Sequence, residues 1–195
     1  MSGRWAVFLD RDGTLNEEVG LVSRPEQLVL LPGAVRALKA LRGAGALLVV
    51  ATNQPVVARG LIDEEALAGI HQRLRELLAE EGVSLDAIYY CPHHPEKGHP
   101  EAPDPRYRRD CSCRKPKPGM ILSAAERFGV DMARSFFVGD STRDVAAARA
   151  AGCRPVLVRT GFAGRDGKCP EARPDAEVAD IAAAADWILG PAGAH

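Results

Sequence analysis

The chain alternates short apolar runs with longer segments in which apolar residues recur every three or four positions. Each apolar run predicts a buried parallel strand. These runs are Trp5–Leu9, Ala46–Ala51, Ala87–Tyr90, Ser135–Val138 and Pro155–Val158. The periodic segments 34–42, 63–80, 118–128 and 144–151 predict amphipathic helices between the strands, and 177–189 predicts a helix or a short strand followed by one.

Strands that alternate with helices indicate an α/β fold, a Rossmann-like doubly wound parallel sheet with helices on both faces. We expect one domain over residues 1–195. Ligands bind such sheets beyond the carboxyl ends of the strands. Asp10, Thr52, Cys91 and Asp140 all fall at those ends, so we expect the functional site there.

The composition is that of an ordinary soluble globular protein, with 46% hydrophobic and 26% charged residues. A formal net charge of -1 indicates no general attraction to nucleic acid or to an anionic membrane. The apolar run 44–52 is much shorter than the ~20 residues of a membrane helix. The first ten residues lack the features of a secretory signal. We therefore expect a cytoplasmic monomer that binds neither nucleic acid nor membrane.

Two carboxylates, Asp10 and Asp12, lead directly out of the first strand and are followed by Gly13. Carboxylates separated by one residue can converge on one centre at a strand end. One can attack phosphorus, while the other protonates the leaving oxygen and later activates water. A bound divalent cation would offset their repulsion. The same triplet also suits a solvated turn, because Asp and Gly are common turn residues.

The longer string Phe8–Asn16 (FLDRDGTLN) resembles the first motif of the haloacid dehalogenase superfamily of phosphatases. Three further pieces follow in the order of that superfamily: Thr52-Asn53-Gln54, Lys115-Pro116 and Gly139–Asp144. The resemblance implies an aspartyl-phosphate intermediate with Asp10 as nucleophile and Asp12 as general acid/base. It also implies that Thr52 and Lys115 hold the phosphoryl group.

The resemblance further implies a magnesium ion, held by the carboxylates of Asp10 and Asp140 and by the backbone carbonyl of Asp12. Oxygen ligands of this kind suit magnesium. Asp144 would either ligate the ion directly or orient a bound water. Catalysis of phosphoryl transfer is mostly positioning and charge neutralisation, which is the chemistry that these groups offer.

A long irregular segment is bracketed by Cys91-Pro92-His93 and Cys111-Ser112-Cys113. Three thiolates and one imidazole suit tetrahedral zinc, and four protein ligands make such a site structural. The alternative is thiols without metal, because these spacings differ from those of common zinc fingers. We expect a zinc-stabilised loop over residues 91–113, with Cys91, His93, Cys111 and Cys113 as ligands.

The two pairs of zinc ligands, followed by Arg114-Lys115-Pro116, resemble one subgroup of the superfamily. This subgroup contains the heptose 1,7-bisphosphate 7-phosphatases and the histidinol-phosphate phosphatases, and the strings 89–96 (YYCPHHPE) and 111–120 (CSCRKPKPGM) are closer to the heptose enzymes. The resemblance implies a phosphomonoester hydrolase that removes the 7-phosphate of a small phosphorylated sugar. No inserted segment is long enough for a large cap domain. The implied substrate-binding residues are Glu18, Val19, Gly20, Leu21, Asn53, Gln54, Arg114 and Ser141.

Other functions stay open on the sequence. The substrate could be histidinol phosphate or another small phosphomonoester, and the chain could be a zinc-stabilised binding module without catalysis. A nucleic-acid 3′-phosphatase would need a broader basic surface than the net charge indicates. One position departs from the superfamily pattern: Pro55 follows the Thr-Asn-Gln triplet, and its missing N–H cannot contact a phosphate.

Overall fold

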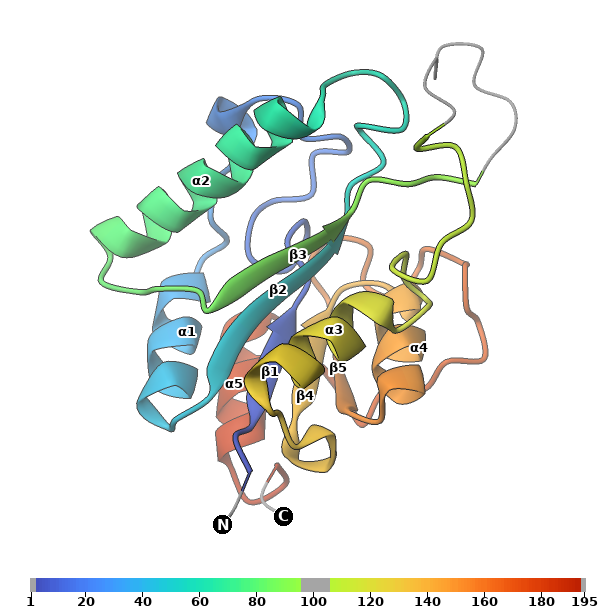
Figure 1. Cartoon of the computed structure of the whole chain (residues 1–195). Helices are drawn as coiled ribbons and strands as arrows, with labels where there is room; N and C mark the ends of the chain where they lie inside the picture. The colour runs from blue at the N-terminus through green and yellow to red at the C-terminus, as the bar shows by residue number, and fades with distance from the viewer. Residues whose placement is uncertain (1–2, 96–105, 194–195) are drawn as a thin grey trace.

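The computed structural model describes residues 3–95 and 106–193 (Figure 1). The strands are β1 (Ala6–Leu9), β2 (Leu47–Asn53), β3 (Ala87–Cys91), β4 (Phe136–Gly139), β5 (Arg154–Val158) and β6 (Ala176–Val178). The helices are α1 (Ala34–Gly43), α2 (Glu64–Glu80), α3 (Gly119–Phe128), α4 (Thr142–Ala151) and α5 (Ile181–Leu189), with short 3₁₀ turns at Pro25–Gln27 and Met132–Arg134.

The sheet is parallel throughout, in the order β3-β2-β1-β4-β5-β6. The chain therefore winds outward in one direction from β1 and in the other from β4, which confirms the doubly wound α/β fold. β1 and β4 lie side by side at the switch point, where Leu9 pairs with Val138. The loops after them separate there, and such a crevice is where ligands bind in this architecture.

Two layers of helices cover the sheet (Figure 1). Val7 and Leu9 of β1 pack in the cluster formed with α1, α2 and α5, whereas Ala6 and Phe8 pack in the cluster formed with α3 and α4. All four side chains are fully buried. Burial on both faces explains why the strands are continuous apolar runs in the sequence. No large cap domain is present in the described residues.

The structure moves several of the expected boundaries by one or two residues, and two of these changes concern the site. β2 continues through Thr52 and Asn53 because these residues pair with Tyr90 and Cys91 of β3, so Cys91 is a strand residue and not the first residue of a loop. The helix expected over 144–151 begins two residues earlier, at Thr142. The C-terminal segment forms a short strand and then a helix, the second of the two expected arrangements.

Residues 96–105 of the loop expected over 91–113 lie outside the described residues. Within 3–95 and 106–193, no helix combines the length and the apolar composition needed to cross a membrane.

Candidate active site

A buried group of charges lies at the switch point. Lys115 Nζ is 3.0 Å from Asp10 Oδ2 and 2.6 Å from Asp144 Oδ1, and the lysine side chain is only 2% exposed. One carboxylate oxygen from each of Asp10, Asp140 and Asp144 lies within 4.8 Å of the other two. Residues far apart in the sequence thus place three carboxylates around one ammonium group.

The group carries more negative charge than Lys115 neutralises. The pKa of Asp10 is raised to about 6, chiefly by burial; Lys115 opposes the rise, and the Asp144 and Asp12 carboxylates add to it. The pKa of Asp140 is raised to about 8, first by burial and then by Asp10 and Asp144. A divalent cation would relieve this repulsion, and the all-oxygen donor set fits magnesium.

The backbone closes tightly around Asp140. Gly13 and Gly161 both have a positive φ, and a Cβ atom at either position would overlap the Asp140 carboxylate. Asp140 Oδ2 accepts a hydrogen bond of 2.6 Å from the Phe162 amide. One carboxylate oxygen is therefore fixed by the loop that follows β5, and glycine is needed where the chain crosses it.

The Asp12 carboxylate is held on three sides. It accepts hydrogen bonds from Arg11 Nε (3.0 Å) and Nη2 (2.9 Å), from Asn16 Nδ2 (2.9 Å) and from Gln54 Nε2 (2.8 Å). Burial favours the neutral acid, but the Arg11 guanidinium and these hydrogen bonds outweigh it and lower the pKa of Asp12. Asp12 is thus ionised and fixed in direction.

The sequence analysis did not single out Arg11 or Asn16, although both belong to the FLDRDGTLN string. An arginine beside two carboxylates is usually solvated, and only the fold makes this side chain fully buried.

The two amides expected to bind substrate are engaged within the protein. Gln54 Nε2 donates to both Asp12 and Thr52 Oγ1 (3.0 Å), and its Oε1 accepts from Arg11. Asn53 makes a reciprocal pair with the backbone of Lys115, at 3.0 and 3.1 Å. These contacts orient the predicted catalytic groups, and they leave Gln54 no amide hydrogen for a substrate.

A cavity of about 240 Å³ opens above these groups. Of the expected substrate-binding residues, Glu18, Gly20, Leu21, Asn53, Gln54, Arg114 and Ser141 line it. Val19 does not line the cavity and is 46% exposed. The cavity is also lined by Arg59, Arg143 and Phe162, which had no assigned role in the sequence analysis. Phe162 lies in the irregular loop after β5, where no sequence pattern indicates what it approaches.

Ser141 and Asp144 begin α4 with a capping box. Asp144 Oδ2 accepts from the Ser141 amide (3.0 Å) and hydroxyl (2.7 Å), while its other oxygen contacts Lys115. This cap explains why the helix begins at Thr142. Asp144 therefore fixes both the helix start and the lysine.

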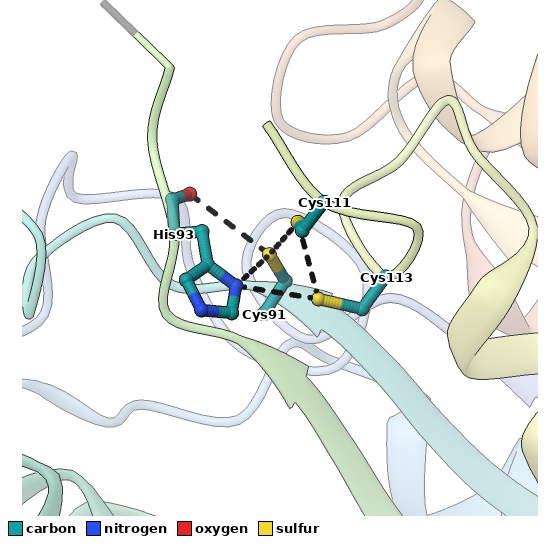
Figure 2. A group of neighbouring side chains, drawn as sticks. All are labelled: Cys91, His93, Cys111 and Cys113. Carbon is teal, nitrogen blue, oxygen red and sulfur yellow. Dashed lines mark hydrogen bonds between the residues drawn. The ribbon is translucent and has the colours of Figure 1, made fainter. Parts of the chain in front are cut away.

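The four expected zinc ligands converge near the end of β3 (Figure 2). Cys111 Sγ lies 3.5 Å from Cys91 Sγ and 3.2 Å from Cys113 Sγ, and His93 Nδ1 lies 3.7 and 3.4 Å from the Cys91 and Cys113 sulfurs. Sulfurs bound to one tetrahedral zinc at ~2.3 Å would be about 3.8 Å apart. The cluster is therefore close to the size that zinc requires.

The ionisation of Cys91 and the sulfur separations are both consistent with a metal site. Burial and the neighbouring Cys113 raise the pKa of Cys91 strongly, so without a cation this thiol stays neutral. The sulfur separations are far longer than the ~2.05 Å of a disulfide. A bound metal would stabilise the thiolates that burial disfavours.

Comparison with known proteins decides the family. The haloacid dehalogenase (HAD) family model described as HAD-hydrolase-like matches residues 112–184. A Photorhabdus laumondii protein named D-glycero-beta-D-manno-heptose-1,7-bisphosphate 7-phosphatase is 44% identical over 157 residues, covering 80% of this chain and 81% of that relative. A Thermosynechococcus vestitus protein named D-glycero-D-manno-heptose-1,7-bisphosphate 7-phosphatase is 44% identical over 191 residues, covering 95% of each chain.

The chain belongs to this heptose bisphosphate phosphatase family. A solved structure agrees: the D,D-heptose 1,7-bisphosphate phosphatase of B. bronchiseptica has a TM-score of 0.79 and 41% identity, covering 95% of this chain and 98% of that one. That crystal contains magnesium and phosphate. The likeness spans nearly the whole chain, so the family's fold extends over both the carboxylate group and the Cys/His cluster.

Proposed function

We propose that this family member hydrolyses the 7-phosphate of D-glycero-D-manno-heptose 1,7-bisphosphate through a phosphorylated Asp10. The observation that carries the proposal is the position of Asp10, which lines the cavity together with Lys115, 3.0 Å away, and with the fixed Asp12 carboxylate. The names of the relatives indicate which sugar the substrate contains. The geometry supports Asp10 as the nucleophile, Asp12 as the acid/base and Lys115 as the positive charge in one aspartyl-phosphate cycle.

In the first step, an Asp10 oxygen forms a bond to phosphorus and the bond between phosphorus and the sugar oxygen breaks. Asp12 gives its proton to that leaving oxygen. Arg11 lowers the pKa of Asp12, so Asp12 must gain this proton after the substrate binds. The negative charge of the bound substrate favours the neutral acid, and we assign the gain of the proton to that effect. Lys115 and the Thr52 hydroxyl donate hydrogen bonds to the phosphoryl oxygens.

In the second step, a water molecule bonds to phosphorus, Asp12 accepts its proton, and the bond to Asp10 breaks. Phosphate leaves and Asp10 is restored. Gln54 serves both steps, because it donates hydrogen bonds to Asp12 and to Thr52 at once. It thereby holds the acid/base in a fixed position relative to the Thr52 hydroxyl, which binds the phosphoryl group.

Magnesium would be held by the carboxylates of Asp10 and Asp140 and by the backbone carbonyl of Asp12. When bound, the ion would neutralise charge on the phosphoryl oxygens. Asp144 is committed to Lys115 and to the start of α4, so we assign it a positioning role.

Zinc would be held by Cys91, His93, Cys111 and Cys113. It would fasten the loop 91–113 and so support Arg114 and Lys115, which follow directly. We assign it no part in the chemistry, because four protein ligands leave no open position.

A substrate panel tests the proposal. Phosphate release is measured with both anomers of heptose 1,7-bisphosphate, with histidinol phosphate and with fructose 1,6-bisphosphate, for the wild type and for Asp10→Asn. We expect turnover of heptose 1,7-bisphosphate by the wild type and none by Asp10→Asn. The matched control is Asp110→Asn, an exposed aspartate whose side chain pairs with Lys117.

The other outcomes are informative. Preference for histidinol phosphate would mean that this compound, and not the heptose, is the substrate. Substantial activity in Asp10→Asn would mean that Asp10 is not the nucleophile. Zinc-loaded protein that releases phosphate from none of the four compounds would indicate a binding module without catalysis.

We also propose that the chain folds as one domain and works as a cytoplasmic monomer. The cysteines are free thiols, and thiols persist in a reducing compartment, which supports the location. Size-exclusion chromatography with light scattering checks the monomer, and fractionation of cells checks the location.

A further inference from the structure

Two arginines share one wall of the active site. Arg114 follows the zinc-ligand pair, and Arg143 lies in the first turn of α4. Both line the active-site cavity, and both line an adjoining cavity of about 300 Å³. Burial lowers the pKa of Arg114 and the positive charge of Arg143 acts in the same direction, while the Cys91 and Cys111 sulfurs oppose the change.

Between them, the two arginines have one carboxylate partner among the described residues: Asp166, which pairs with Arg143. Lys115 contacts two carboxylates and Arg11 contacts one, whereas Arg114 has no carboxylate partner among the described residues. It donates to the His93 carbonyl at 3.0 Å and interacts with the Cys91 sulfur. Glu18 lines the same cavity but forms no ion pair with either arginine in the described part of the chain. The wall therefore offers positive charge to a ligand.

The Arg143 side chain is held by a buried carboxylate, that of Asp166. Its Nε donates to Asp166 Oδ2 at 3.1 Å, and its terminal nitrogens make no hydrogen bond to the described residues. The Asp166 side chain is 3% exposed and is itself held by the Thr142 amide (2.9 Å) and hydroxyl. Asp166 thus fixes the arginine by its Nε edge and leaves the two terminal nitrogens, donors that can bind phosphate in pairs, without a partner among the described residues, on a residue that lines the cavity.

We propose that Arg143, oriented by Asp166, joins Arg114 in binding the second phosphate of the substrate, the one that is not transferred. The inference rests on the proposed function, because only a sugar bisphosphate offers a second dianion beside the reacting one. This phosphate does not change during the reaction, so its binding energy is the same in the ground and transition states. Arg143 is then a specificity-determining residue, and Asp166 is a positioning residue.

Steady-state kinetics with a matched pair of substrates test the proposal: heptose 1,7-bisphosphate and heptose 7-phosphate, which lacks the second phosphate. For Arg143→Met we expect kcat/KM for the bisphosphate to fall about 10- to 100-fold, the range for one charged hydrogen-bonding group, mostly through KM. We expect the value for the monophosphate to change less than about 3-fold. Arg143→Lys should keep part of the kcat/KM for the bisphosphate that Arg143→Met loses. Asp166→Asn should lower this kcat/KM by a smaller factor, again with a larger effect on the bisphosphate than on the monophosphate. Arg165→Met removes the same charge from an exposed site in the loop that holds Asp166, and it should leave the kinetics with both substrates unchanged.

Calorimetry on Asp10→Asn protein compares the affinities for the bisphosphate and the monophosphate without turnover. The result therefore tests this inference separately from the proposed catalytic function. We expect the bisphosphate to bind more tightly than the monophosphate, and Arg143→Met to remove most of that difference. Equal losses on both compounds would mean that Arg143 acts on the transferred phosphate or on the fold. No loss on the bisphosphate, in kinetics or in binding, would remove Arg143 from the site; either result overturns the inference. Absent turnover with these binding results intact would instead count against the catalytic proposal alone.

Discussion

Replacing Lys115 by methionine removes the only cation that contacts the Asp10 and Asp144 carboxylates within the described residues. Methionine keeps a similar length, and it can pack over Phe137, whose ring centre is 5.1 Å from Nζ. The change therefore isolates the charge. Asp10, Asp140 and Asp144 would remain together without a cation beside them, and the burial of Asp140 and Asp144 limits screening by water.

The expected cost is about 3–5 kcal/mol in the free energy of unfolding without added magnesium, the range for removing one partner of a buried ion pair. For a chain of this size that is a fall of about 6–20 °C in Tm. We expect kcat to fall at least about 100-fold as well, because a donor to the phosphoryl oxygens is lost.

Thermal unfolding followed by circular dichroism measures the first effect, and phosphate release measures the second. Lys117→Met is the matched control, since this lysine is 46% exposed and pairs with an exposed aspartate. It should cost less than about 1 kcal/mol. Adding Asp144→Asn to Lys115→Met removes one of the repelling carboxylates, so the double variant should be more stable than the sum of the single effects by about 0.5–3 kcal/mol.

A Tm for Lys115→Met within about 2 °C of the wild type would refute the reasoning, because that shift corresponds to at most about 1 kcal/mol. Strict additivity in the double variant would also refute it, since the charges would then not interact.

Three further predictions follow from the same site. Gly13→Ala should weaken magnesium binding and cost about 1–3 kcal/mol, because the new Cβ meets Asp140 at a positive φ; isothermal titration with an unchanged magnesium affinity would contradict this. The magnesium-induced rise in Tm should be larger near pH 8 than near about pH 5. The folded pKa values of Asp10 and Asp140, about 6 and about 8, lie above the ordinary 3.8, so their contribution to the stability of the metal-free protein is present at low pH and is lost as the pH rises through those values. A pH-independent shift would exclude that coupling. Cys111→Ser should abolish zinc binding, measured by elemental analysis, and lower Tm, whereas Cys153→Ser, a buried cysteine outside the cluster, should keep its zinc. Full zinc content in Cys111→Ser would remove it from the ligand set.

The strands illustrate what could be predicted from the chain. Every expected strand exists because a parallel strand buried on both faces must be apolar at each position, and that constraint is visible locally. The helix boundary at Asp144 was wrong by two residues, because the capping box that begins α4 depends on where the Ser141 side chain points. Phe162 and Asp166 could not be predicted to lie at the site, since they belong to an irregular loop whose path is set by packing against α4 and the end of β4.

The sequence by itself determined the order of the elements, the doubly wound class and the chemistry available at the strand ends, because apolar periodicity and the motif residues are properties of short segments. Only the tertiary structure decided how those groups are used. Gln54 and Asn53 are polar residues next to a predicted catalytic threonine in the sequence, yet contacts across 42 and 62 positions turn them toward Asp12 and Lys115. Arg143 becomes part of the cavity wall because Asp166, 23 positions away, holds it there. Hydrogen-bond partners and burial depend on which distant segments the fold brings together, and no local pattern encodes that distance.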